Sequence, residues 1–262
     1  MKSITDNLKR VITEAKKNIS IFIQGPLDER TYEAINCYKD FGQIVLSTWD
    51  NEDLSLLNKA EVEYDLVLSS YPNGHENFKS GYYEFQTSYS GADKCNLDYI
   101  CKFRSDELYP DLDKFILNFL TNQDKIITTD NGFWKPLGPR SNHFASFAGH
   151  LYLGKSNYIK NGLKFCRDWS KSQDFKNLHF ISVEQTLGYF FSYAMGYDLL
   201  KEDWKEVFRK NIYITPCLEL KNHLHSGQSF SKYKFKRLKD YPYGRPDNHD
   251  PKSLYKHSLD IL

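Results

Sequence analysis

The sequence predicts an α/β domain with a mostly parallel central sheet flanked by helices, followed by a C-terminal extension. Short apolar runs at 19–24, 43–48 and 65–70 alternate with segments of helical periodicity, as in strand–helix–strand units with parallel strands. The 262 residues suffice for one large domain with a full core. No internal repeat, low-complexity tract or change of composition divides the chain before about residue 220.

An amphipathic helix and the first strand–helix–strand unit open the chain. The helix is expected over 3–17, and its apolar face carries Ile4, Leu8, Val11, Ile12 and Ala15. The apolar run 19–24 is the first strand and ends at a turn. Asp28 then begins a second helix, whose buried side carries Ala34, Ile35 and Tyr38. The run 43–48 is the second strand, and a single helix between two strands indicates that they are parallel.

Further strands follow, and one of them organises the predicted site. The run 65–70 is the third strand, and a polar, aromatic helix or lid follows over 75–90. The stretch 97–110 alternates apolar and polar residues and ends in Ser105-Asp106-Glu107 and a proline-marked turn. Its two faces carry Tyr99, Cys101 and Phe103 on one side and Ile100, Lys102 and Arg104 on the other. The remaining elements are expected to be a helix at 111–120, a strand at 125–129, a strand pair at 144–154, helices at 157–169 and 182–195, and a strand at 212–215.

Composition excludes several classes of protein. With 35 basic and 34 acidic residues the net charge is +1, which argues against nucleic acid as the main partner. No signal-peptide pattern occurs in the first thirty residues, and no stretch approaches the roughly 20 apolar residues that span a bilayer, so we expect a cytoplasmic protein. The 5 cysteines include no Cys-x-x-Cys pair and are expected to be reduced. Neither a dinucleotide-binding glycine motif nor a P-loop is present.

Polar residues follow three predicted strands at the end where an open α/β sheet binds its ligand. They form the segments Gln24-Gly25-Pro26, Ser47-Thr48-Trp49 and Arg104-Ser105-Asp106. Asp106 is a hard oxygen ligand suited to Mg²⁺ or Mn²⁺, while Lys102 and Arg104 could balance the acids or hold a phosphate. A surface salt-bridge cluster and an ordinary turn are the alternative interpretations. Trp49 either stacks on a base as a rim aromatic or closes the sheet edge.

These motifs, in this order, resemble the WavE lipopolysaccharide-synthesis family. The resemblance spans about residues 19–195 and is carried by Gln24-Gly25-Pro26, Ser47-Thr48-Trp49, Lys102-Phe103-Arg104-Ser105-Asp106, His150-Leu151-Tyr152-Leu153-Gly154 and Glu184-Gln185. The chain departs from the family pattern at two places. Gly149 stands where the family has an acid, and the Asn-x-x-Arg-Gln stretch expected before the central strand is not found in 82–88.

The resemblance implies a glycosyltransferase of the A-type fold. It implies a nucleotide-sugar-binding domain over 1–220 and a basic, aromatic extension over 221–262 that packs on the same domain. The enzyme would move a sugar from a nucleotide-diphosphate donor to a saccharide or lipid-linked glycan in lipopolysaccharide, capsule or other surface-glycan synthesis. Mn²⁺ or Mg²⁺ would be held at the Asp-x-Asp-like motif, here Arg104-Ser105-Asp106. The implied donor-binding residues are Gln24, Gly25, Pro26, Thr48, Trp49, Lys102, Arg104, Ser105 and Asp106.

Sugar transfer requires neutralisation of the leaving diphosphate and a base for the acceptor hydroxyl. Asp106 with a metal is one candidate for neutralisation, together with His223 and His225, because alternate residues of an extended segment face one side. If the anomeric centre inverts, we expect Glu184 to be the base, with Asp130 as the second choice. Two solvated histidines and an acid that only caps a helix are the structural alternatives.

The C-terminal extension and two other functions complete the predictions. Cations and aromatic residues over 232–245 could rest on the anionic inner face of a membrane, or could simply be a solvated surface segment. A catalytically inactive carbohydrate-binding protein is the first alternative function. A metal-dependent phosphoesterase is the second, although it needs more Asp and His ligands at strand ends than this chain offers.

Overall fold

A computed structural model describes residues 2–28, 31–72, 81–129, 147, 149–171, 183–216, 220, 224–225 and 236–237. The strands of its main sheet are β1 Ile19–Gln24, β2 Gln43–Trp49, β3 Asp65–Ser69, β4 Tyr99–Arg104, β6 Ile126–Thr129, β7 Tyr152–Lys155 and β8 Ile212–Thr215. A second, small sheet is formed by β5 Glu107–Leu108, β9 Leu224–His225 and β10 Lys236–Arg237. The helices are α1 Lys2–Lys16, α2 Thr31–Cys37, η1 Leu54–Leu57, α3 Tyr82–Lys94, α4 Asp113–Leu120, α5 Ser156–Lys171, α6 Val183–Ala194 and α7 Trp204–Asn211.

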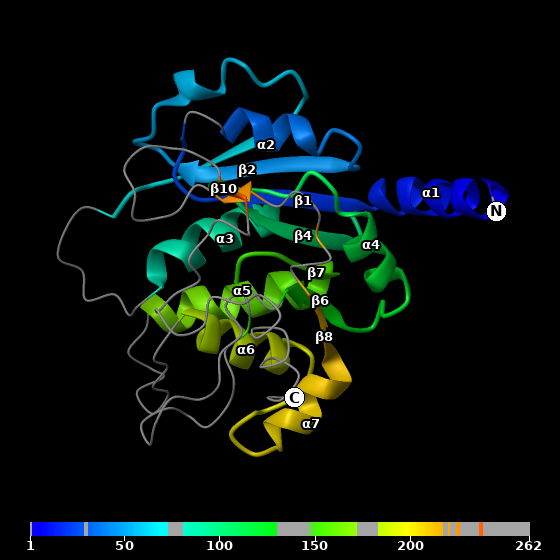
Figure 1. Ribbon diagram of the computed structural model, residues 1–262. Helices are drawn as coiled ribbons and strands as arrows, with labels where there is room; N and C mark the ends of the chain where they lie inside the picture. Colours follow the sequence, from blue (N-terminus) through cyan, green and yellow to red (C-terminus); the bar gives the residue numbers. More distant parts are fainter. Residues whose placement is uncertain are drawn as a thin grey trace.

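The main sheet has seven strands in the order β3-β2-β1-β4-β7-β6-β8. Neighbouring strands from β3 to β4 are parallel, as are β6 and β8, and β7 runs antiparallel to both of its neighbours. Helices cover both faces of the sheet (Figure 1). The predicted α/β architecture with a mostly parallel sheet is therefore confirmed.

Each face of the sheet has its own hydrophobic core. Phe22, Val45 and Ile100 belong to the core that the sheet shares with α3, α5 and α6. Ile21 and Phe103 belong to the core on the opposite face, under α2 and α4. Burial on both faces explains why the strands read as nearly continuous apolar runs. It also places Lys102 and Arg104 on the α3 face of β4, as the alternation predicted.

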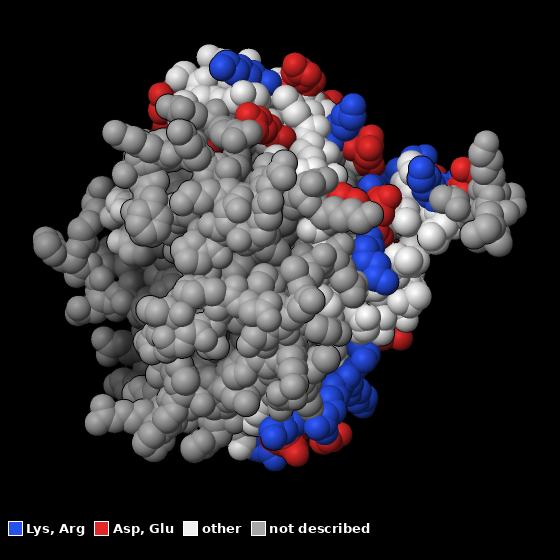
Figure 2. All heavy atoms as spheres, viewed as in Figure 1, with Lys and Arg blue, Asp and Glu red and all other residues white. Residues whose placement is uncertain are grey.

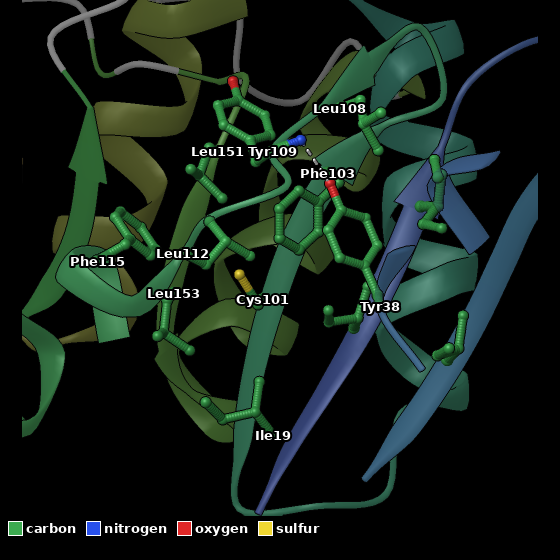
Figure 3. Packing of buried hydrophobic residues seen from close by; sticks show 14 of the residues in the cluster. Ile19, Tyr38, Cys101, Phe103, Leu108, Tyr109, Leu112, Phe115, Leu151 and Leu153 are labelled. Atoms are coloured by element: carbon green, nitrogen blue, oxygen red, sulfur yellow. Dashed lines mark hydrogen bonds between the residues drawn. The ribbon is translucent and has the colours of Figure 1, made fainter. Parts of the chain in front are cut away.

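Tyr38 fixes the segment that follows β4. Its ring stacks on Phe103 with centroids 4.3 Å apart, and its hydroxyl accepts a hydrogen bond of 3.1 Å from the backbone N–H of Tyr109 (Figure 3). Both tyrosines are fully buried. Because of this contact, the chain turns sharply after Arg104 and continues as β5 beside the end of the main sheet.

Three sequence expectations need correction. Among the α1 side chains that the structure describes, from residue 6 onward, only Ile12 is buried, while Leu8 and Val11 are 41% and 49% exposed, because this helix projects beyond the sheet (Figure 1). The expected strand pair at 144–154 is reduced in the described residues to β7, which starts at residue 152. The helix α7 was not expected; Asp203 caps it by accepting a 2.9 Å hydrogen bond from the N–H of Lys205.

Charge and cysteines follow the composition. Lys and Arg side chains stand beside Asp and Glu side chains around α1, α2 and α7 on the face shown in Figure 2. The cysteines within the described part of the chain are unpaired, and Cys101 is fully buried in the core as predicted. Among the described helices, none combines the length and apolar character needed to cross a membrane.

Candidate functional site

A pocket of about 160 Å³ lies at the carboxyl ends of β1, β2 and β4. It is lined by Gln24, Gly25, Pro26, Trp49, Tyr83, Glu84, Arg104, Ser105 and Asp106. After β1 the chain moves outward to β2 and β3, and then returns to place β4 on the other side of β1. Such a switch point is where open α/β sheets bind ligands. The structure therefore brings together every predicted donor-binding residue except Thr48 and Lys102.

Close packing between the ends of β1 and β4 requires a glycine at position 25. Gly25 has φ of +137°, and a Cβ atom there would lie only 2.4 Å from Ser105 Oγ. Ser105 N–H donates to the Gln24 carbonyl at 2.9 Å, and its hydroxyl donates to the Pro26 carbonyl at 2.7 Å. These bonds hold the two strand ends together and shape the floor of the pocket.

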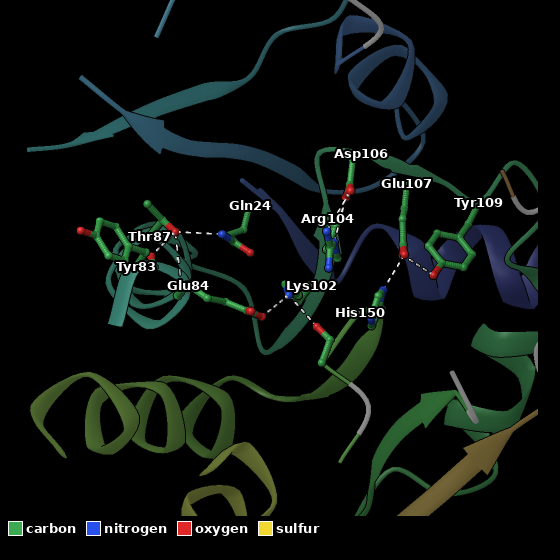
Figure 4. Close-up of polar contacts among 11 residues, drawn as sticks. Gln24, Tyr83, Glu84, Thr87, Lys102, Arg104, Asp106, Glu107, Tyr109 and His150 are labelled. Atoms are coloured by element: carbon green, nitrogen blue, oxygen red, sulfur yellow. Dashed lines mark hydrogen bonds and ion pairs between the residues drawn. The ribbon is translucent and has the colours of Figure 1, made fainter. Parts of the chain in front are cut away.

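A buried polar layer attaches α3 to the strand ends. Gln24 Nε2 donates to Thr87 Oγ1 at 2.9 Å (Figure 4). Ser47 Oγ donates to the Thr87 carbonyl at 2.7 Å. These contacts account for the polar residues that end β1 and β2, because a polar side chain buried at a strand end needs a partner. They also bring the first turn of α3, with Tyr83 and Glu84, to the pocket.

Lys102 lies behind the pocket wall and is fully buried. Its Nζ is 3.1 Å from Glu84 Oε1 and donates to the Gly149 carbonyl at 2.5 Å. Burial raises the pKa of Glu84, but the nearby charges of Lys102 and Arg104 outweigh it, so this pKa lies below its ordinary value. The ammonium of Lys102 therefore acts on Glu84 and on residue 149, and any effect on a ligand would pass through them.

Arg104 and Asp106 form a two-pronged ion pair at the pocket. Arg104 Nε and Nη2 donate to the two carboxylate oxygens of Asp106, each at 2.8 Å, and the side chains are only 16% and 17% exposed. Burial lowers the pKa of Arg104, but Asp106, followed by Glu107 and Glu84, raises it above its ordinary value. The guanidinium is therefore a permanent positive charge at the end of β4.

Glu107 and His150 form an unexpected pair next to the site, although neither of them lines the pocket. The carboxylate of Glu107 is fully buried; Tyr109 Oη donates to its Oε2 at 2.6 Å, and His150 Nδ1 lies 2.5 Å from its Oε1 (Figure 4). The acid run Asp106-Glu107 was visible in the sequence, and so was His150 in the glycine-rich segment. Nothing in the sequence showed that two residues 43 positions apart form a pair.

Three aromatic residues border the pocket on the β2 side. Trp49 is only 6% exposed, and its ring packs edge-on against Tyr71 and Tyr83 at 5.3 and 5.8 Å. Tyr71 and Tyr83 are 43% and 45% exposed. Burial of Trp49 favours the second of its two predicted roles, closing the sheet edge, and the exposed ring surface at the rim belongs to Tyr71 and Tyr83.

Two further predicted site residues do not line the pocket, and two others are not described by the structure. Thr48 is fully buried, does not line the pocket, and its hydroxyl has no hydrogen-bond partner among the described residues. Glu184 is in the first turn of α6, where its carbonyl accepts from Phe147 N–H at 2.9 Å, and it is not among the lining residues. Asp130 and His223 lie outside the described residues.

The predicted C-terminal extension reaches the site through β9. The backbone of His225 pairs with Glu107 in an antiparallel register, and β10 pairs with β9. Only the backbone of His225 is described, so its predicted role as a metal ligand remains a prediction from the sequence.

The described residues contain no group of three or more His, Cys, Asp or Glu side chains arranged to hold a metal ion. Asp106 nevertheless fits a cation that arrives with its ligand, because Mg²⁺ is commonly held by one or two carboxylates together with substrate phosphates and water.

No protein-family model matches the chain, and no curated protein matches it. Among solved structures, the chain is similar to one described as a glucose-1-phosphate thymidylyltransferase from Bacillus anthracis in complex with a sucrose. The identity is 8%, the alignment covers 76% of this chain and 86% of that one, and the TM-score is 0.45. A similarity of this size carries no argument about function. Membership of the WavE family remains a prediction from the motifs.

Proposed function

We propose that this chain is a glycosyltransferase that binds a nucleotide-diphosphate sugar in the pocket at the carboxyl ends of β1, β2 and β4. It would transfer the sugar to a saccharide or lipid-linked glycan, as in the synthesis of lipopolysaccharide, capsule or another surface glycan. One observation carries the proposal. The permanent guanidinium charge of Arg104, the exposed ring of Tyr83 and the carboxylates of Glu84 and Asp106 line one pocket at the switch point of the sheet. Tyr71 packs beside Tyr83 at its rim.

The pocket volume indicates how the donor would lie. About 160 Å³ is less than the roughly 300–1,000 Å³ typical of small-molecule sites, so it would hold only the diphosphate part of the donor. The base would then stack on Tyr83 and Tyr71 at the rim, because an aromatic ring accepts the face of any base. The sugar would extend past Arg104 toward β7.

The charges suit a leaving diphosphate. Arg104 would interact with its oxygens, and the N-terminal turn of the 13-residue α3 borders the same pocket, where backbone N–H groups favour an anion. A divalent cation bound with the donor would neutralise further charge on the leaving group. Asp106 would hold that cation, with His223 and His225 as the other ligands expected from the sequence.

Binding of nucleotide diphosphates tests the proposal directly. UDP, GDP, CDP, ADP and dTDP would each be titrated, with and without Mn²⁺, into the wild type and the Tyr83→Ala and Asp106→Asn variants, followed by thermal shift and calorimetry. We expect at least one nucleotide to raise the melting temperature of the wild type. Loss of base stacking by Tyr83→Ala should weaken its binding about tenfold. Asp106→Asn should reduce the gain that Mn²⁺ provides.

A second pocket provides the matched control. This pocket, of about 450 Å³, lies at the amino ends of β2 and β3, and Tyr64 lines it. Tyr64→Ala should leave nucleotide binding unchanged. The proposal is wrong if no nucleotide diphosphate stabilises the wild type at millimolar concentration, or if Tyr64→Ala weakens binding as much as Tyr83→Ala. Sugar binding without nucleotide binding would favour the carbohydrate-binding alternative.

A further inference from the structure

We infer that His150 is the general base that removes the proton from the acceptor hydroxyl, and that Glu107 and Tyr109 are positioning residues that orient it. This inference rests on the proposed function, and it replaces Glu184 in the role that the sequence prediction gave to it. Three observations support it: how the imidazole is held, where it lies along the site, and how exposed it is.

The imidazole is held by a buried carboxylate whose two oxygens both have partners. Glu107 is fully buried, with Oε1 2.5 Å from His150 Nδ1 and Oε2 2.6 Å from the Tyr109 hydroxyl. When Glu107 is ionised, its carboxylate accepts hydrogen bonds and donates none, so that in this state Nδ1 carries the proton of the contact. In a neutral ring the lone pair then belongs to Nε2, which is the arrangement that a histidine base requires.

His150 lies at the end of the site opposite the aromatic rim. Gly149, which precedes it, accepts the hydrogen bond from Lys102, and a Cβ atom at Gly149 would lie 3.6 Å from Glu84 Oε1 in the pocket wall. In Figure 4, Arg104 lies between Tyr83 on one side and His150 on the other. A donor whose base stacks on Tyr83 and whose diphosphate meets Arg104 would therefore direct its sugar, and the acceptor, toward His150.

The imidazole is also accessible enough to act. Its side chain is 19% exposed, whereas its partner Glu107 is fully buried. Glu184, by comparison, begins α6, and its described polar contact is made by its backbone carbonyl with Phe147. His150 thus combines partial exposure with a fixed orientation, and these are the two properties that a base at the acceptor side needs.

The proposed step conserves atoms and charge. The acceptor oxygen forms a bond to the anomeric carbon of the donor as the bond from that carbon to the diphosphate oxygen breaks. The electron pair of the breaking bond leaves with the nucleoside diphosphate. The acceptor proton passes to Nε2 of His150, and the negative charge of Glu107 stabilises the imidazolium that forms. With water in place of the acceptor, the same step releases the free sugar.

The experiment compares four variants with the wild type: His150→Gln, Glu107→Gln, Tyr109→Phe and Glu184→Gln. First, binding of the nucleoside diphosphate that stabilises the wild type is measured for each. Then release of that diphosphate from its nucleotide sugar is followed, with water as the acceptor. We expect His150→Gln to lower kcat by about 100- to 10,000-fold with little change in nucleotide affinity. Glu107→Gln should lower kcat by a smaller factor, and Glu184→Gln should stay within threefold of the wild type.

A spectroscopic readout separates orientation from general structural damage. Two-bond ¹⁵N–¹H correlations of the histidine rings report which nitrogen carries the proton. They should show His150 protonated at Nδ1 in the wild type, and a mixture of tautomers in Glu107→Gln. Tyr109→Phe should keep the tautomer and the melting temperature closer to the wild type than Glu107→Gln does.

The outcomes distinguish this inference from the proposed function. If the wild type binds no nucleotide or releases none from any nucleotide sugar, the proposed function fails and the inference falls with it. If the wild type is active but His150→Gln keeps its kcat, the proposed function stands and His150 is not the base. A proton found at Nε2 of His150, or a larger loss of kcat in Glu184→Gln than in His150→Gln, would also overturn the inference.

Discussion

The Lys102–Glu84 pair predicts an asymmetric effect of substitution on stability. The side chain of Lys102 is 1% exposed, whereas that of Glu84 is 29% exposed. Removing one partner of a buried ion pair costs about 3–5 kcal/mol, because the other charge stays buried without compensation. Since water reaches the Glu84 side, we expect the free energy of unfolding to fall by about 3 kcal/mol in Glu84→Gln, the lower end of that range.

The converse substitution should cost less. Lys102→Met keeps most of the buried volume and leaves a carboxylate that water partly solvates. Its main cost is the lost hydrogen bond to the buried Gly149 carbonyl, about 1–2 kcal/mol. In the Lys102→Met background, Glu84→Gln should then cost almost nothing, because no buried ammonium remains. The double-mutant cycle should therefore give a coupling energy of about 2–3 kcal/mol.

Urea unfolding followed by tryptophan fluorescence at pH 7 measures all four proteins. The exposed pair Lys155–Asp124 is the matched control: its ion-pair distance is 2.8 Å, but Asp124 is 95% exposed, so Asp124→Asn should cost less than about 1 kcal/mol. A Glu84→Gln variant within about 1 kcal/mol of the wild type would refute the reasoning about desolvation. So would an equal cost of Glu84→Gln with and without Lys102.

Three further predictions follow from pKa shifts and backbone geometry. Because the pKa of Glu84 is lowered in the folded state, ionised Glu84 stabilises the fold fully above pH 4.5, its ordinary pKa, and this stabilisation is lost as the pH falls below that value. Urea midpoints measured against pH should therefore fall more steeply for the wild type than for Glu84→Gln. Equal slopes would contradict this prediction. In urea unfolding, Gly25→Ala should lower the free energy of unfolding by about 1–3 kcal/mol more than Gly196→Ala does. Both glycines have positive φ, but only a Cβ atom at position 25 would meet another atom, Ser105 Oγ. Similar losses of stability in the two variants would argue against this contact. In mass-spectrometric mapping with a thiol reagent at pH 8, Cys37 should react first among the described cysteines, because it is only half-buried. Burial raises the pKa of all four, but it raises that of Cys95 to about 12 and those of Cys101 and Cys166 well above their ordinary value, so early labelling of Cys101 would contradict its burial.

Much of the fold was predictable because its signals are local. The strands β1, β2, β3 and β8 were found within one residue, since an apolar run bounded by turn residues is readable from neighbouring positions alone. The buried side of α2 was also correct, with Ala34, Ile35 and Tyr38 in the core. On α1, only part of the expected apolar face is covered by the rest of the fold. Periodicity indicates which residues share a face, but the rest of the fold decides whether anything covers that face, and Leu8 and Val11 remain exposed.

The site divides in the same way. The sequence by itself determined that polar segments end β1, β2 and β4, and parallel pairing was enough to bring these ends to one edge. Only the tertiary structure decided the pairings across that edge: Lys102 with Glu84, Arg104 with Asp106, and Glu107 with His150. The sequence shows which residues are charged, but the partner of each charge depends on which strands and helices pack together. For this reason the sequence predicted Lys102 in the pocket, whereas the structure places it behind the pocket wall. The position of His150 beside the end of β4 was likewise not predictable, because the sequence showed only the motif that contains it.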